Sequence, residues 1–154
     1  MSPRDLLRFN TAGSVDDGKS TLTGRLLFDT GGLPLDQIEA IAKRSEPTAG
    51  GGLNLAAFTD GLKLEREQGI TVDASYRYFS RTKRDFIVAD TPGHFEFTRN
   101  MLSATTHSDV TLVLVDAIHG VVEQNKRHAY IAALAGVTQL VILVNKMDLL
   151  GYDQ

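Results

Sequence analysis

Three continuous apolar segments, each followed by a polar residue, constrain the fold of this 154-residue chain more than any other feature. Uninterrupted apolar strands are typical of a parallel sheet that helices cover on both faces. The polar residues then lie at the carboxyl ends of the strands, where open α/β sheets bind ligands. The segments and their following residues are Phe86–Ala89 with Asp90, Val110–Val115 with Asp116, and Leu140–Val144 with Asn145.

Helical spacing of apolar residues and the positions of glycine and proline predict the remaining elements. The alternation of apolar and polar residues over 72–79 predicts a strand with one solvated face, joined by a hairpin turn at 81–85 to the next strand. The sequence therefore predicts an α/β fold, with a mostly parallel sheet flanked by helices and one antiparallel hairpin strand. We also expect an opening strand around 6–12, helices at 21–28, 35–42, 95–106 and 122–135, and a loop at 45–52.

The segment from Gly13 to Ser20 fits the pattern G-x-x-x-x-G-K-[ST], between an expected strand and an expected helix. Its glycines let backbone N–H groups face a phosphate, Lys19 can reach the β- and γ-phosphates, and the Ser20 hydroxyl can ligate Mg²⁺. The alternative is a glycine-rich turn with an incidental lysine, which the flanking strand and helix disfavour. The candidate phosphate-binding residues are Gly13, Ser14, Val15, Asp16, Asp17, Gly18, Lys19, Ser20 and Thr21.

A second short motif, Asp90-Thr91-Pro92-Gly93, follows the first of the three apolar strands. A carboxylate at this point can hold Mg²⁺ through water, as the second acidic element of a phosphate-loop site does. The N–H group of Gly93 can meet a γ-phosphate. By itself the motif is equally consistent with a tight turn, but beside a phosphate loop the functional interpretation is favoured.

The third motif, Asn145-Lys146-Met147-Asp148, follows the last apolar strand. The carboxylate of Asp148 can accept two hydrogen bonds from the N1–H and the exocyclic amine of guanine, whereas adenine offers no such pair of donors. Taken alone, the motif is also consistent with an aspartate that caps a helix. In order after the other two motifs, Asn145, Lys146 and Asp148 indicate a guanine nucleotide.

Composition excludes several other kinds of protein. Sixteen Lys and Arg against nineteen Asp and Glu leave a net charge of −3, which disfavours a duplex-DNA binder. The absence of cysteine excludes disulfides and cysteine-built zinc sites. Because no apolar run is long enough for a membrane span or a secretory signal, we expect a cytoplasmic protein without a membrane partner.

The order of these motifs, with GIT at Gly69–Thr71 between the first two, resembles the translational-factor class of P-loop GTPases. The longer stretches GSVDDGKSTLTGRLL, FTDGLKLEREQGITVD and FIVADTPGHFEFTRNM are more similar to the large, GTP-hydrolysing subunits of bacterial sulfate adenylyltransferases. This resemblance covers nearly the whole chain from Leu6 and departs at residues 95–97 and 103–106. It implies that residues 1–154 are a GTP-binding domain with GTP and Mg²⁺ as cofactors.

The resemblance also implies roles for individual residues. His94 would be the catalytic residue that orients the attacking water, with Val15 and Ile70 as apolar gates around it. Gly93 would sense the γ-phosphate through its N–H group, in the segment that Asp90 begins. The implied metal ligands are Ser20, Thr71 and, through water, Asp90, and the implied switch I residues are Gly69, Ile70 and Thr71.

For the whole protein the resemblance implies GTP hydrolysis that drives sulfate activation, in which ATP and sulfate give adenylyl sulfate and pyrophosphate. The partner would be a separate small catalytic subunit. The alternatives are a translation-factor GTPase that acts with RNA and the ribosome, and a nucleotide-dependent switch with negligible hydrolysis. We expect this chain to be an N-terminal fragment that stops before the last strand and helix of the domain.

The other histidines are scattered along the sequence. For His107, His119 and His128, a solvated or helix-face position is favoured over metal ligation.

Overall fold

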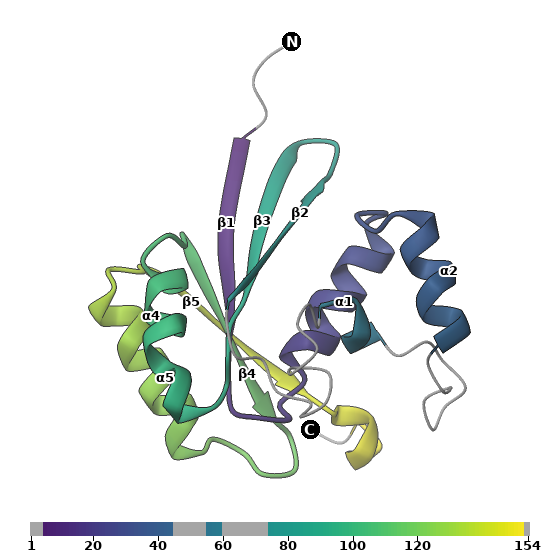
Figure 1. The fold of residues 1–154 in the computed structure, drawn as a ribbon. Coiled ribbons are helices and arrows are strands. Elements are labelled where there is room, and N and C mark those ends of the chain that lie inside the picture. The colour runs from purple at the N-terminus through teal and green to yellow at the C-terminus, as the bar shows by residue number, and fades with distance from the viewer. Residues whose placement is uncertain (1–4, 45–54, 60–73, 153–154) are drawn as a thin grey trace.

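Residues 5–44, 55–59 and 74–152 are described in this computed structural model, and they form one five-stranded sheet with helices on both faces (Figure 1). The expected loop at 45–52, the start of the strand predicted from residue 72, and residues 69–71 lie outside the described residues. The strands are β1 (Asp5–Ala12), β2 (Ser75–Ser80), β3 (Arg84–Asp90), β4 (Val110–Asp116) and β5 (Gln139–Asn145). The helices are α1 (Lys19–Asp29), α2 (Leu35–Arg44), α4 (Thr98–Thr105) and α5 (Glu123–Leu134), with the short 3₁₀ helices η1 (Leu55–Phe58), η2 (Phe95–Phe97) and η3 (Met147–Leu150).

The strand order is β2-β3-β1-β4-β5, and only the β2–β3 pair is antiparallel. This confirms the predicted α/β class and the hairpin, which is closed by backbone hydrogen bonds between Arg81 and Arg84 of 2.9 and 3.3 Å. β1 lies at the centre of the sheet, between β3 and β4. The strand order therefore reverses next to β1, which is the point where open α/β sheets bind ligands beyond their carboxyl ends.

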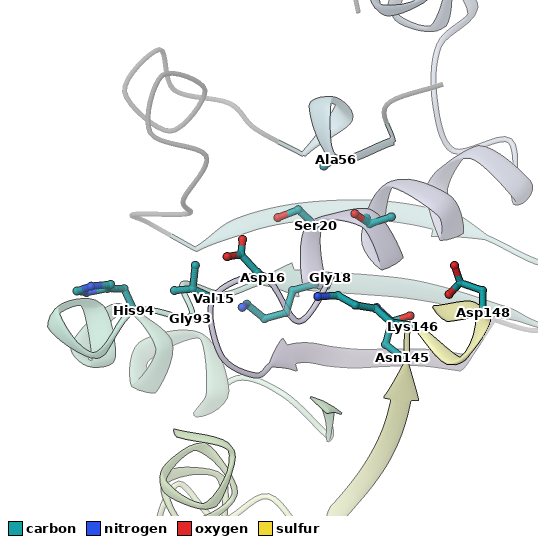
Figure 2. Close-up of a pocket in the computed structure, with 12 residues that line it drawn as sticks. Val15, Asp16, Gly18, Ser20, Ala56, Gly93, His94, Asn145, Lys146 and Asp148 are labelled. Atoms are coloured by element: carbon teal, nitrogen blue, oxygen red, sulfur yellow. The ribbon is translucent and has the colours of Figure 1, made fainter. Parts of the chain in front are cut away.

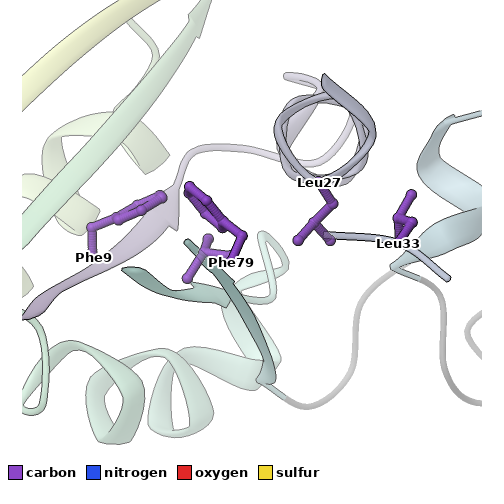
Figure 3. Close-up of a cluster of buried hydrophobic side chains, with 5 residues drawn as sticks. Phe9, Leu27, Leu33 and Phe79 are labelled. Carbon is purple, nitrogen blue, oxygen red and sulfur yellow. The ribbon is translucent and has the colours of Figure 1, made fainter. Parts of the chain in front are cut away.

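Helices α1 and α2 lie on one face of the sheet, and α4 and α5 lie on the other (Figure 1). On the α1 face, Phe9, Leu27 and Phe79 belong to one buried apolar cluster (Figure 3). The rings of Phe79 and Phe86 stack there with centroids 4.8 Å apart. A smaller cluster of Ala12, Met101 and Val113 lies on the other face, so each face of β1 is buried by its own layer.

The two tyrosines of β2 lie on the exposed face of this strand. One face of this strand is solvent-exposed, as predicted, but it is the face that carries Tyr76 and Tyr78, which are 43% and 67% exposed. Phe79, on the opposite face, is buried against Phe9 and Phe86. The large apolar ring of Phe79 thus decides which face of β2 turns inward.

β5 also differs from the expectation that both faces of each apolar strand are covered. It is an edge strand of the described sheet and pairs with β4. Its apolar residues Leu140, Val141, Ile142 and Val144 are between 40% and 57% exposed. The same apolar pattern in β4 is buried, because β4 has a neighbouring strand on both sides and helix α5 packed against it.

No helix among the described residues has both the length and the apolar character needed to cross a membrane.

Candidate nucleotide-binding site

A pocket of about 420 Å³ lies at the carboxyl ends of the central strands (Figure 2). The three motifs, which are separated by more than fifty residues in the sequence, all contribute to its wall. Its described lining consists of Val15, Asp16, Gly18, Lys19, Ser20, Thr21, Ala56, Gly93, His94, Asn145, Lys146 and Asp148.

The loop between β1 and α1 requires glycine at Gly18. This residue has a φ of 92° in the left-handed region, and a Cβ atom there would lie 2.3 Å from Nδ2 of Asn145. Both conditions exclude an ordinary side chain. The loop therefore turns into α1 directly against Asn145 of the third motif, and the N-terminus of α1 faces the pocket.

Lys19 is a buried residue, and its ammonium group lies under the loop. Its Nζ donates a hydrogen bond of 2.6 Å to the Ser14 carbonyl oxygen. Burial lowers the pKa of Lys19, and the nearby carboxylates of Asp90, Asp17 and Asp16 oppose that shift. The loop thus presents a buried cation at the position where the motif predicts phosphates.

Asp90 lies beside the first residues of α1 and is 1% exposed. Its Oδ2 accepts a hydrogen bond of 3.0 Å from the Ser20 hydroxyl, and its Oδ1 accepts one of 2.8 Å from the Thr11 hydroxyl. These oxygens are hard donors of the kind that Mg²⁺ prefers. The side chains present at this point therefore fit a magnesium ion.

Gly93 packs against the phosphate loop. A Cβ atom there would lie 2.3 Å from Nζ of Lys19 and 2.9 Å from the Gly13 carbonyl oxygen, so only glycine fits this approach. The next residue, His94, also lines the pocket. Its imidazole lies 6.0 Å from the ring of Phe97 and extends away from Ser20, beyond Val15 (Figure 2).

At the other end of the pocket, Asn145 joins β5 to the phosphate loop through a 2.8 Å hydrogen bond from its Nδ2 to the Asp17 carbonyl oxygen. Lys146 adopts a left-handed conformation with φ of 62°, and its Nζ lies 2.7 Å from Oδ2 of Asp116. The hydrogen bond from Lys146 is the largest of the causes that hold the pKa of Asp116 well below its usual range. Asp148 faces the pocket at the opposite end from His94 (Figure 2).

Asp148 is not the cap of η3, because the residue before this short helix is Lys146. The helix-cap alternative for the third motif is therefore not supported by the structure. The side chain of Asp17 does not line the pocket but turns inward, where it accepts hydrogen bonds from Asn125 and the Ser14 N–H group.

Two residues of α5 that the sequence analysis did not assign to the site lie directly under the phosphate loop. His128 is 1% exposed, and its Nδ1 accepts a 3.0 Å hydrogen bond from the Gly13 N–H group. Burial, with a smaller contribution from Lys19, lowers the pKa of His128 to about 4. His128 is thus on a helix, but it is buried rather than solvated. Asn125 is likewise buried, at 3% exposure.

The pocket lining described above does not include two groups of predicted residues. Gly69, Ile70 and Thr71 lie outside the described residues. His119 is exposed, with its Nδ1 3.2 Å from Oδ2 of Asp116, and His107 is exposed near the end of α4. Both agree with the expected surface positions.

The chain matches a family model, curated proteins and solved structures. The family model described as the elongation factor Tu GTP-binding domain matches residues 4–154. The chain is 55% identical over 149 residues to the bifunctional enzyme CysN/CysC of Mycobacterium tuberculosis, covering 97% of the chain and 24% of that protein. It is 53% identical over 153 residues to sulfate adenylyltransferase subunit 1 of Cellvibrio japonicus, covering 98% of the chain and 32% of that protein.

Among solved structures, a bacterial selenocysteine-specific elongation factor is similar, with a TM-score of 0.69 and 24% identity over 94% of the chain and 20% of that protein. At this identity the match supports the fold alone. The chain spans about a quarter to a third of the length of the curated relatives that it matches.

Proposed function

The chain belongs to the family of elongation factor Tu GTP-binding domains, and from this premise we propose that it binds and hydrolyses GTP as part of a sulfate-activating enzyme. The observation that carries the proposal is the meeting of three separate motifs at one pocket. One end of this pocket carries a buried lysine and a helix N-terminus, and the other end carries the carboxylate of Asp148. This arrangement suits a ligand with phosphates at one end and guanine at the other.

We propose that Lys19 and the loop backbone hold the β- and γ-phosphates, while Asp148 reads guanine and Asn145 keeps the two ends in register. Ser20 and, through water, Asp90 would hold Mg²⁺ together with Thr71. When bound, the ion would neutralise charge on the phosphate oxygens. A hydrogen bond already holds the Ser20 hydroxyl next to the Asp90 carboxylate, so the two proposed magnesium-binding groups lie together.

Hydrolysis needs an oriented water molecule more than a covalent nucleophile. We propose that His94 orients this water, because it is the titratable side chain that follows Gly93 at the phosphate end of the pocket. In this structure the imidazole lies beside Phe97 and its Nδ1 is 3.8 Å from Oε2 of Glu96. The histidine must therefore turn towards the phosphates when GTP is bound.

The substrate and the partner of the whole protein are proposed from its relatives. The relatives are named sulfate adenylyltransferase subunit 1 and bifunctional enzyme CysN/CysC. We infer that GTP hydrolysis here drives the formation of adenylyl sulfate and pyrophosphate from ATP and sulfate. The designation as subunit 1 supports a second subunit as partner, to which we assign the adenylyl transfer.

The test is to measure GTP hydrolysis by the full-length protein with Mg²⁺ alone, with the second subunit, ATP and sulfate, and separately with ribosomes. We expect strong stimulation in the second mixture, together with formation of adenylyl sulfate. Stimulation by ribosomes alone would indicate a translation factor instead. Tight GTP binding with negligible hydrolysis in every mixture would indicate a nucleotide-dependent switch.

A further inference from the structure

Helix α5 contacts the phosphate loop from below through a buried amide. Asn125 donates from its Nδ2 to Oδ2 of Asp17 at 3.0 Å and to the Leu114 carbonyl oxygen at 2.9 Å. Its Oδ1 accepts a 2.9 Å hydrogen bond from the Val122 N–H group. One side chain thus joins the start of α5, the end of β4 and the phosphate loop.

Asp17 transmits this contact to the backbone of the loop. The Oδ2 atom that accepts from Asn125 also accepts a 2.6 Å hydrogen bond from the N–H group of Ser14, three residues earlier. Asp17 is buried, so these hydrogen-bond donors must stabilise its negative charge in place of water. Its neighbours Val15, Asp16 and Gly18 line the pocket.

On these contacts, and resting on the proposed function, we propose that Asn125 is a positioning residue for the phosphates. It holds the Asp17 carboxylate under the loop, and Asp17 in turn fixes the curvature of the loop that meets the nucleotide. Without Asn125, the carboxylate would lose a buried donor and move towards water, and the loop backbone would move with it. Small displacements of groups that position a substrate cause large losses of binding and rate.

The decisive experiment is calorimetric titration of the full-length protein and its Asn125→Ala variant with GTP, followed by competition with inorganic tripolyphosphate. We expect both ligands to bind about 10-fold or more weakly, by similar factors, because a hydrogen bond to a charged group is lost and the base pocket is not touched. The number of binding sites per chain should stay the same. Lys126→Ala is the matched control, since Lys126 is the next residue on α5 and its side chain is 66% exposed.

Unchanged GTP affinity in Asn125→Ala would overturn the inference. A reduced number of sites with unchanged affinity would also overturn it, because it would show only a loss of folded protein. Weaker binding of GTP without weaker binding of tripolyphosphate would place the effect at the base and overturn it as well. If the unsubstituted protein does not bind GTP, the proposed function fails and the inference fails with it.

Variants of Asp17 test the same contact from the other side. Asp17→Ala should resemble Asn125→Ala, and the double variant should bind GTP within about 3-fold of the weaker single variant, because both act through one contact. Asp17→Asn keeps an oxygen that can accept both hydrogen bonds, so its loss should be several-fold smaller than that of Asp17→Ala. Losses that multiply in the double variant, or equal losses in Asp17→Asn and Asp17→Ala, would overturn the proposed contact.

Discussion

The two ends of the pocket are built differently. At the phosphate end, Asp17, Lys19 and Asp90 are buried and hydrogen-bonded to the loop, α5 or β1. At the base end, Asp148 stands on a short helix that follows the edge strand β5, and its neighbour Leu149 is 62% exposed. The phosphate end is therefore preformed by the centre of the sheet, whereas the base end depends on a few polar contacts at the sheet edge.

This difference follows from the strand order. The phosphate loop leaves β1, which has a strand on each side and a helical layer on each face. The base-reading motif leaves β5, which pairs with β4 at the edge of the described sheet. Between the two ends, the hydrogen bond from Asn145 to the Asp17 carbonyl oxygen is a direct connection. Substitutions of residues outside this contact should have separable effects at the two ends.

His94 is the exception at the phosphate end, because its side chain is 34% exposed and can turn. We predict that His94→Ala lowers the rate of GTP hydrolysis by about 10²- to 10⁴-fold and leaves GTP affinity nearly intact, since we propose that His94 acts on the attacking water. Single-turnover hydrolysis and equilibrium binding in the full-length protein measure the two quantities. An equal loss of rate and affinity would instead assign His94 to the preformed part of the site.

The free energy of unfolding should depend on pH, because His128 is buried under the phosphate loop. Its pKa is lowered from 6.5 to about 4 in the folded state, so the unfolded chain binds more protons between these values. The contribution of His128 is therefore fully present above about pH 6.5 and is lost as the pH falls towards 4. The loss is on the order of 3 kcal/mol.

Urea unfolding at pH 7 and pH 5 measures this effect. The matched variant is His128→Asn, which keeps an acceptor for the Gly13 N–H group but does not titrate in this range. We expect the unsubstituted protein to lose more of its free energy of unfolding than the variant between the two pH values. Parallel losses in both proteins would show that His128 does not cause the pH dependence.

Removal of the buried cation should weaken binding through the phosphates alone. Lys19→Ala is predicted to reduce GTP affinity by about 1.5–3 kcal/mol, because it removes a charge-assisted contact. The preference for GTP over XTP should not change. Titration with both nucleotides checks the prediction, with Lys43→Ala as a control because the Lys43 side chain is 79% exposed on α2. Undiminished GTP affinity in Lys19→Ala would contradict the phosphate-loop interpretation.

Substitution of Asp148 at the base end should change the preference between GTP and XTP, with a smaller change in free energy than the preceding substitutions. Asp148→Asn replaces the carboxylate that we propose accepts hydrogen bonds from guanine with an amide that can donate to the carbonyl of xanthine. We expect a change of about 1–3 kcal/mol in relative affinity from GTP towards XTP. Competition between GTP and XTP measures it, and Asp36→Asn on α2 is the exposed control. If Asp148→Asn prefers GTP as strongly as the unsubstituted protein does, Asp148 does not read the base.

The order of the main helices and strands, and the polar residues at the ends of the strands, could be predicted from the sequence. All three motifs lie at the carboxyl ends of strands, as their positions after apolar segments predicted. They are the loop with its glycines and Lys19, the DTPG motif at the end of β3 and the NKMD motif at the end of β5. These elements are predictable because hydrophobic periodicity and turn residues depend only on a few neighbouring residues, and not on contacts with distant segments. The hairpin between β2 and β3 was predictable for the same reason.

The burial of these segments and side chains could not be predicted from the local sequence pattern and follows from how the elements pack. The apolar runs of β4 and β5 look alike in sequence, yet one is central and the other is an edge strand. Asp17 and Asp16 are adjacent aspartates, but one turns towards Asn125 and the other lines the pocket. His128 resembles the exposed His119 until α5 places it under the phosphate loop. Burial depends on what packs across from a residue, and that is set by strand order and helix placement rather than by the local pattern.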